Sequence, residues 1–172
     1  MTHPDNDQAG ERPVAVVDID GVVADVRHRL HHLSARPKRW DAFFRAADDD
    51  AAHPEGLEVV ATLAADHEIV YVTGRPEHLR RATEAWLMRH GIGGHRLVMR
   101  RTNDRRPAAV MKLQAVRHLA GERTVAVIVD DDQAVLDAYA KAGFTTFPAT
   151  WEARLLDEAR ALADAQERQG RT

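Results

Sequence analysis

The chain has 172 residues, a formal net charge of −3, an ordinary apolar fraction of 44% and no cysteine. This length predicts one domain with a normal hydrophobic core. The lack of cysteine excludes disulfides and thiolate metal sites, and no apolar run approaches the roughly 20 residues that a membrane span needs. We expect a soluble, cytoplasmic protein, because the polar stretch from Met1 to Arg12 lacks the apolar core of a signal peptide.

Residues 1–12 are predicted to form a disordered arm, since they are polar and have no apolar periodicity. A β-branched apolar run then predicts a buried strand that ends at Asp18. The region from about residue 22 to residue 55 mixes arginine, histidine and aromatic residues, and we expect short helical pieces there. The next predicted elements are a helix over residues 57–66, a strand over 68–73 and a helix that begins at Pro76 and ends at His90.

Strands and helices continue to alternate after Gly91. The expected elements are a strand at 97–99, a helix over 107–119, a strand over 124–129, a helix over 133–142, a strand over 144–147 and a helix over 151–169. The main domain is predicted to span residues 13–150. The C-terminal segment, residues 151–172, carries an apolar face that is expected to pack on this domain or to form a dimer contact; the face consists of Trp151, Leu155, Leu156 and Leu162.

Alternating strands and helices are typical of a parallel sheet with helices on both faces. The apolar runs also lack in/out alternation, as expected for strands covered on both sides. We therefore predict an α/β fold, a three-layer α/β/α sandwich around a central parallel sheet, with a small helical insert. Ligands of such sheets bind beyond the carboxyl ends of the strands.

Polar clusters follow three of the predicted strands. They are Asp18 with Asp20, Thr73 with Arg75, and Asp130 with Asp131. Carboxylates held together at a strand end are costly unless a cation lies between them. Hard oxygen ligands without histidine or cysteine suit Mg²⁺, which usually combines one or two carboxylates with a substrate phosphate. These strand ends therefore predict a metal site suited to phosphoryl transfer, with a carboxylate as nucleophile.

The chain resembles the haloacid dehalogenase superfamily of phosphatases over roughly residues 13–148. The four ordered motifs of the superfamily match Asp18-x-Asp20-Gly21-Val22, Thr73-Gly74-Arg75, Lys112 and Val129-Asp130-Asp131. The resemblance implies a Rossmann-like fold and Mg²⁺. It implies that Asp18 is the nucleophile, Asp20 the general acid/base, Thr73 a hydrogen-bond donor to phosphate and Lys112 the cation that neutralises charge. The implied metal ligands are Asp18, the backbone carbonyl of Asp20, Asp130 and Asp131.

A closer resemblance is to the 3′-phosphatase domain of phage-type polynucleotide kinase-phosphatases. The matching stretches are His28-Arg29-Leu30, Lys38 to Phe44, Thr73-Gly74-Arg75-Pro76, Arg105-Arg106-Pro107 and Val110-Met111-Lys112. The resemblance implies that Arg29 and Arg75, with Gly74, contact the substrate phosphate. The sequence departs from the family at Ala108, where relatives carry an aspartate that orients the lysine; Asp104 is the alternative partner. No Walker-type phosphate loop occurs in the sequence.

Other assignments remain open for several residues. Thr73 also suits the N-cap of a helix, which is itself an anion site, and Asp132 is predicted to be an N-cap rather than a metal ligand. His28 and His32 have zinc-binding spacing, but without a third ligand we favour solvated or substrate-facing histidines. Trp40, Phe43 and Phe44 have helical spacing and are predicted to be core rather than a base-stacking surface. The remaining open group is a run of arginines that either contacts a nucleic-acid backbone or is solvated: Arg96, Arg100, Arg101, Arg105 and Arg106.

The sequence thus predicts a Mg²⁺-dependent phosphomonoesterase that works through an aspartyl-phosphate on Asp18. The insert over residues 22–55 is short, so the site is expected to stay open to macromolecular ends. Its substrate is predicted to be a phosphorylated DNA or RNA 3′ end, and no membrane contact is expected. The alternatives are a nucleotidase or other small-molecule phosphatase, and a non-catalytic module that binds phosphorylated ends.

Overall fold

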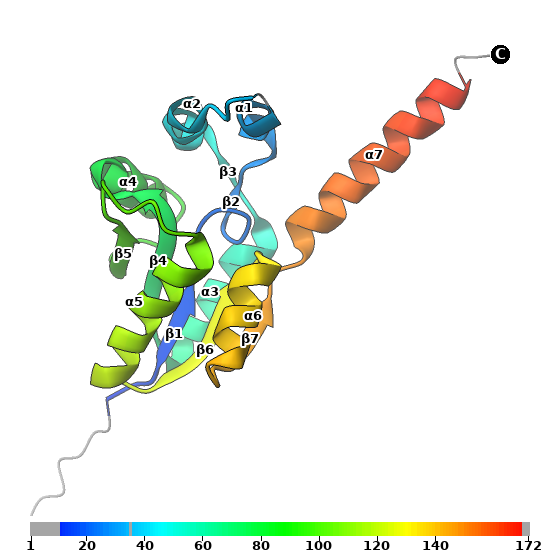
Figure 1. Cartoon of the computed structure of the whole chain (residues 1–172). Helices are drawn as coiled ribbons and strands as arrows, with labels where there is room; N and C mark the ends of the chain where they lie inside the picture. Colours follow the sequence, from blue (N-terminus) through cyan, green and yellow to red (C-terminus); the bar gives the residue numbers. More distant parts are fainter. Residues whose placement is uncertain (1–10, 35, 170–172) are drawn as a thin grey trace, which may run out of the picture.

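The computed structural model describes residues 11–34 and 36–169, with side chains described through Ala161. Its centre is a sheet of five parallel strands in the order β5–β4–β1–β6–β7 (Figure 1). The strands are β1 (Val14–Val17), β4 (Glu68–Pro76), β5 (Arg96–Arg100), β6 (Val125–Asp130) and β7 (Thr146–Pro148). Because all five run the same way, their carboxyl ends lie along one edge of the sheet.

Helices cover both faces of this sheet. Alternate residues of β1 point to opposite faces: Ala15 and Val17 belong to one apolar cluster, and Val14 and Val16 to the other. The first cluster is covered by α3 (Pro54–Asp66) and α4 (Arg80–Arg89), and the second by α5 (Ala108–Glu122) and α6 (Gln133–Lys141). The predicted three-layer α/β/α fold with a central parallel sheet is therefore confirmed.

A small helical insert, here called the cap, lies between β1 and α3 and sits over the carboxyl ends of the strands (Figure 1). Two antiparallel strands of two residues each, β2 (Ala24–Asp25) and β3 (Ala51–Ala52), form its stem. Between them lie α1 (His31–Ser34), α2 (Trp40–Arg45) and 3₁₀ turns at Arg27–Arg29 and Ala46–Asp49.

The segment after β4 differs from the sequence prediction. Pro76 does not begin a helix: it stays extended and pairs with Arg100 of β5, so β4 runs through it. A 3₁₀ turn at Glu77–Leu79 follows, and α4 begins only at Arg80. The fixed φ of proline suits an extended residue as well as a helical one, so the sequence did not separate the two. The predicted N-cap at Asp132 is confirmed, because its Oδ1 accepts hydrogen bonds from the N–H groups of Ala134 and Val135.

The sequence predictions for the two ends of the chain concern residues that the structure describes only in part. The predicted arm lies outside the described residues except for Glu11 and Arg12, which contact the domain: Glu11 pairs with Arg123 at 2.9 Å, and Arg12 donates to the carbonyl of His67 at 3.0 Å. Among the described side chains of helix α7 (Trp151–Gln169), the buried ones are Trp151 and Glu152 of its first turn.

Beyond that turn α7 projects away from the domain (Figure 1). Leu155 and Leu156 stay half-buried, whereas residues 157–161 are exposed and mostly charged, so this part of the helix has little apolar surface to bury. Leu162, which was predicted to belong to the apolar face, lies outside the described side chains. Among the described residues no helix combines the length and the apolarity that a membrane crossing requires.

Candidate active site

The centre of the site is a buried carboxylate–lysine–carboxylate bridge. Asp18 follows β1 and Asp130 ends β6, and these strands are neighbours, so the two carboxylates meet at the edge of the sheet. Lys112, from the second turn of α5, places its Nζ 2.7 Å from Asp18 Oδ2 and 2.8 Å from Asp130 Oδ2. Its side chain is buried.

Asp131 completes the acidic group. Oxygens of Asp18, Asp130 and Asp131 lie within 4.8 Å of one another. The carboxylate of Asp131 reaches solvent on one side and lies against the backbone of Gly21 on the other, where a Cβ atom would stand 2.1 Å from Asp131 Oδ2. Gly21 also has a φ of +79°, so this position needs glycine for its conformation and for the space it leaves.

The electrostatics of this group fit a bound cation. Burial raises the pKa of Asp18 well above its usual value; Lys112 opposes that shift, while Asp130 and Asp131 add to it. Burial and the charge of Asp130 raise the pKa of Asp131 to about 7. Asp18 Oδ1 is buried and has no hydrogen-bond partner among the described residues. Three crowded carboxylates and an unpartnered carboxylate oxygen form a donor set of the kind that Mg²⁺ takes.

A second network surrounds Asp20, which lies two residues after Asp18. Arg75 donates to Asp20 Oδ1 from Nε at 2.9 Å and from Nη2 at 2.6 Å, and Arg29 donates to the same oxygen from Nη2 at 2.8 Å. Burial raises the pKa of Asp20, but Arg75 and Arg29 outweigh it and hold this pKa below its ordinary value. Both arginines are fully buried, so in this structure their partners are carboxylates of the protein.

Asp50 is the residue that sequence reasoning missed. Its side chain is fully buried at the end of the cap and binds both arginines: Arg29 through Nε and Nη2, each at 2.7 Å, and Arg75 through Nη2 at 2.8 Å. His28 adds a contact at 2.8 Å, so this histidine faces the network and does not bind a metal with His32. Asp50 follows a run of aspartates in an unpatterned segment, and no signal in the sequence distinguishes it from Asp48 and Asp49.

Thr73 and Gly74 also lie at this edge of the sheet. Thr73 is fully buried within β4, three residues before its last residue, and its Oγ1 accepts a hydrogen bond from the N–H of Arg75 at 3.1 Å. The carbonyl of Gly74 accepts one from Arg100 Nε at 3.3 Å. The Asp18 and Asp20 side chains, Gly74 and Lys112 all face one cleft.

Ala108 offers Lys112 no carboxylate at the position where the resemblance implies an aspartate. Asp104 does not replace it, because its carboxylate binds Arg106 at 2.6 and 2.9 Å instead. Lys112 is held by Asp18 and Asp130 alone among the described residues, which keeps it charged: although burial lowers its pKa, the two carboxylates raise it above its ordinary value.

The cleft has a volume of about 1060 Å³ and lies between the cap and the arginine-rich loop after β5. Its floor carries the acidic site, and the cap contributes Trp40, Phe43 and Phe44. Three of the arginines that the sequence singled out line the opposite wall, namely Arg100, Arg105 and Arg106. Arg96 lies elsewhere and pairs with Glu122 at 3.3 Å.

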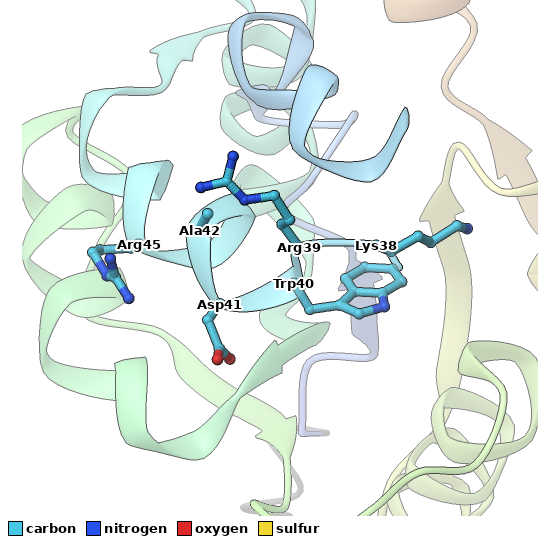
Figure 2. Close-up of a pocket in the computed structure, with 6 residues that line it drawn as sticks. All are labelled: Lys38, Arg39, Trp40, Asp41, Ala42 and Arg45. Carbon is cyan, nitrogen blue, oxygen red and sulfur yellow. The ribbon is translucent and has the colours of Figure 1, made fainter. Parts of the chain in front are cut away.

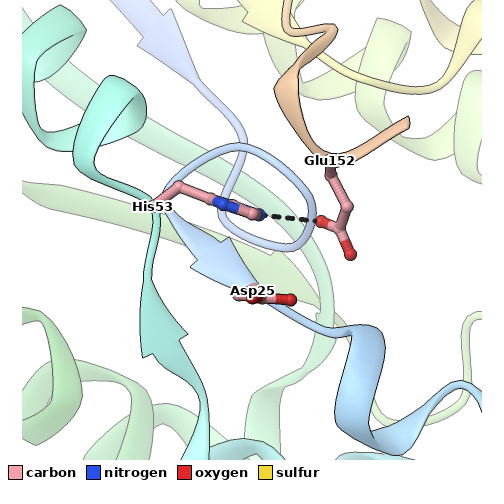
Figure 3. Close-up of side chains that lie close together, drawn as sticks. All are labelled: Asp25, His53 and Glu152. Atoms are coloured by element: carbon pink, nitrogen blue, oxygen red, sulfur yellow. Dashed lines mark hydrogen bonds and ion pairs between the residues drawn. The ribbon is translucent and has the colours of Figure 1, made fainter. Parts of the chain in front are cut away.

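A second group of possible metal ligands lies at the stem of the cap: Asp25, His53 and Glu152 (Figure 3). Here the three side chains already have protein partners. His53 Nε2 lies 3.1 Å from Glu152 Oε2, Glu152 Oε1 accepts from the N–H of Val26 at 3.3 Å, and Asp25 binds Arg27 through both oxygens. This group therefore ties the first turn of α7 to both strands of the stem.

The fold and the site together define a class of protein. It is an α/β domain with an acidic centre at the carboxyl ends of its parallel strands and a small cap above that centre. A family model, the polynucleotide kinase PNKP phosphatase domain, matches residues 12–150. The chain therefore belongs to this family and is a phosphatase of the haloacid dehalogenase superfamily, as its motifs predicted. No curated protein sequence matches the chain.

Solved structures share the fold at low sequence identity. Two chains from structures of the Pnkp1/Rnl/Hen1 RNA repair complex match with TM-scores of 0.67 at 22% and 21% identity. These matches cover 86% and 81% of this chain but 45% and 46% of the other chains, so this chain spans less than half of their length. A haloacid dehalogenase-like hydrolase from Streptococcus pneumoniae matches with a TM-score of 0.55 at 10% identity, covering 80% of this chain and 84% of that one.

Proposed function

We propose that this phosphatase removes 3′-phosphates from nucleic-acid ends through an aspartyl-phosphate on Asp18. The observation that carries the proposal is how the two oxygens of the Asp18 carboxylate are bound. Oδ2 is held by Lys112 at 2.7 Å, whereas the buried Oδ1 has no partner among the described residues and the side chain faces the cleft. Lys112 thus holds the carboxylate at the edge of the cleft and leaves one oxygen to bind a metal or to attack phosphorus.

The reaction has two steps. In the first step an oxygen of Asp18 forms a bond to phosphorus while the bond from phosphorus to the leaving oxygen breaks. The leaving oxygen takes a proton from Asp20. Water then attacks the aspartyl-phosphate, gives a proton to Asp20, and releases inorganic phosphate and the restored carboxylate. Lys112 stabilises the negative charge on the nucleophile and the transferring group. Mg²⁺, held by Asp18, Asp130, Asp131 and the carbonyl of Asp20, would neutralise charge on the phosphate oxygens.

Arg29 and Arg75 affect how readily Asp20 gives and takes a proton. Their hydrogen bonds to its Oδ1 hold Asp20 ionised, which is the form that accepts a proton from water in the second step. The first step needs the protonated form. Arg29 and Arg75 are buried and do not line the cleft, so they act on Asp20 and not on the substrate. A phosphate bound beside Asp20 adds negative charge next to this carboxylate, which raises its proton affinity at that stage.

Two observations support nucleic-acid ends over small phosphomonoesters. The cleft is at the upper limit of ordinary small-molecule pockets, about 1,000 Å³, and has basic and aromatic walls. The family is that of a polynucleotide kinase phosphatase domain, and the structures with the same fold include an RNA repair complex. A nucleotidase shares the chemistry but needs no such walls.

The test compares initial rates with Mg²⁺ on a 3′-phosphorylated oligonucleotide, nucleoside 3′- and 5′-monophosphates and p-nitrophenyl phosphate. We expect the highest kcat/KM for the oligonucleotide. Equal or faster turnover of mononucleotides would replace the proposal with a nucleotidase.

Asp18→Asn is predicted to lower kcat by about 10⁴-fold or more on every substrate, because it removes the nucleophile. Asp137→Asn is the matched control, since Asp137 is exposed on α6 and binds Gln133, and it is expected to keep full activity. Trapping of radiolabelled phosphate on the wild type but not on Asp18→Asn checks the covalent step.

A further inference from the structure

Trp40 is the large aromatic side chain that the fold leaves exposed at the cleft. It is 48% exposed, whereas Phe43, one turn along α2, is 5% exposed and Phe44 is half-buried. The sequence predicted all three as core, and the structure corrects this for Trp40.

Trp40 separates two hollows of the surface. It lines the active-site cleft, and it also lines an outer hollow of about 490 Å³ formed with Lys38, Arg39, Asp41 and Arg45 (Figure 2). Its ring stacks on Phe44 with 5.9 Å between ring centroids and 23° between ring planes, and Lys38 Nζ lies 5.6 Å from its centroid. The indole is thus supported by a second ring while about half of its surface stays open.

Positive charge lies on both sides of Trp40. The outer hollow carries Lys38, Arg39 and Arg45 against a single acid, Asp41. The far wall of the cleft carries Arg105, which is exposed and makes no hydrogen bond or ion pair within residues 11–34 and 36–169. Its neighbour Arg106 is already engaged with Asp104. A half-exposed indole with cations on both sides is the arrangement that binds the bases and backbone of a single strand.

We propose that Trp40 is a stacking surface for a base of single-stranded nucleic acid whose 3′-phosphate lies at Asp18. Arg105 and Lys38 bind backbone phosphates of the same strand. The inference rests on the proposed function and names the form of its substrate. A single strand is favoured because a base must leave its helical stack before it can cover an indole face. A base pair inside a duplex cannot make this contact.

The experiment compares wild type, Trp40→Ala and Trp40→Phe on a 3′-phosphorylated single-stranded oligonucleotide and on glycerol 2-phosphate, a small phosphomonoester without an aromatic ring. Trp40→Ala is expected to lower kcat/KM for the oligonucleotide about 5- to 150-fold and to lower kcat/KM for glycerol 2-phosphate much less. Trp40→Phe should restore most of the loss, since it keeps an aromatic face. Phe147→Ala is the control, because Phe147 is 46% exposed on β7 and lines neither hollow.

A second measurement uses binding instead of turnover. Trp86 and Trp151 are buried, so Trp40 is the exposed tryptophan of this chain. In an Asp18→Asn background, a 3′-phosphorylated single strand is expected to quench tryptophan fluorescence, and Trp40→Phe should abolish the quenching. Arg105→Ala should weaken binding and reduce the slope of log K against log salt by about 1.

The outcomes separate the two proposals. If the wild type prefers mononucleotides, the proposed function fails before any Trp40 variant is made. If it prefers the oligonucleotide but Trp40→Ala retains full kcat/KM, or loses it equally on both substrates, the stacking surface is wrong. If a 3′-phosphate at a blunt duplex end is removed as fast as one on a single strand, the proposal that Trp40 stacks on a base of a single strand is also wrong.

Discussion

Asp50 joins the two arginines of the site. Its carboxylate accepts hydrogen bonds from Arg29 and Arg75, and both arginines also bind Asp20, so two acids and two guanidinium groups balance one another. The three hydrogen bonds to Asp20 Oδ1 fix the orientation of that carboxylate. Asp50 is therefore a positioning residue that acts on Asp20 through the arginines.

Asp50→Asn is predicted to lower the free energy of unfolding by about 3–5 kcal/mol, because it leaves two buried guanidinium groups with one counter-ion. Urea unfolding measures this loss. The same variant should lower kcat/KM more for an alkyl phosphate than for p-nitrophenyl phosphate, whose leaving group needs little protonation.

Asp49→Asn is the matched control, because Asp49 is exposed and adjacent in sequence. It is expected to change the free energy of unfolding by less than about 0.5 kcal/mol. An equal loss of activity on both phosphates in Asp50→Asn would reduce Asp50 to a purely structural role.

At the level of residues, the sequence predicted where the acids at the strand ends lie. Asp18 and Asp130 meet at the edge of the sheet, as neighbouring parallel strands require, and Lys112 of α5 reaches both. Their catalytic roles stay predictions. Asp50 and the exposure of Trp40 were not predictable, because both depend on how the cap folds back over the sheet. Local patterning in residues 22–55 carries no information on that long-range contact.

At the level of elements, the strands were predictable and the ends of several helices were not. Apolar runs placed every strand of the central sheet, because buried parallel strands consist of such runs. The two-residue strands β2 and β3 are too short to leave a pattern. Helix α7 projects because residues 157–161 are exposed and mostly charged and have little apolar surface to pack on the domain. The amphipathic spacing of the whole helix does not show where that packing stops.

The first turn of α7 is fastened to the stem of the cap. Glu152 accepts from the N–H of Val26 beside β2 and contacts His53 beside β3, and Trp151 Nε1 donates to the carbonyl of Val22 at 2.9 Å. The strands of the stem, with two residues each, make few backbone hydrogen bonds of their own. The helix start therefore holds the stem in place.

Glu152→Ala is predicted to lower the free energy of unfolding by about 1–3 kcal/mol, since it leaves the buried Val26 N–H and the His53 ring without their acceptor. Glu158→Ala, in the exposed part of the same helix, should change it by less than about 0.5 kcal/mol. Chemical denaturation of both variants checks the difference. Similar losses in the two would show that the stem does not depend on Glu152.

At the scale of the whole molecule, the acidic centre makes stability depend on pH and metal. Asp131 has a pKa of about 7 in the folded protein against a reference value of 3.8. Between these pH values the folded state holds a proton that the unfolded chain has lost. The contribution of Asp131 to stability is therefore present at low pH and is lost as pH rises through 7.

We predict that Mg²⁺ raises the Tm more at pH 8 than at pH 6, because the metal binds the ionised carboxylate and competes with the proton. Asp131→Asn should raise the Tm of the metal-free protein at pH 8, since it removes a crowded charge, and should abolish most of the Mg²⁺ effect. Thermal unfolding in EDTA and in Mg²⁺ at the two pH values measures both. A Mg²⁺ shift that is equal in wild type and Asp131→Asn would contradict the assignment of Asp131 as a ligand.

The charge network that spans the cap and the sheet limits how freely the cap can be exchanged. Arg75 belongs to the strand scaffold, but its counter-ion Asp50 comes from the inserted segment, and the carbonyl of Asp50 also accepts from Trp86 Nε1 of α4 at 2.9 Å. Grafting a foreign insert onto this scaffold would leave Arg75 buried without that counter-ion. The insert and the scaffold must therefore change together, and a chimera retains the network only if the new insert supplies an arginine and an aspartate in the places of Arg29 and Asp50.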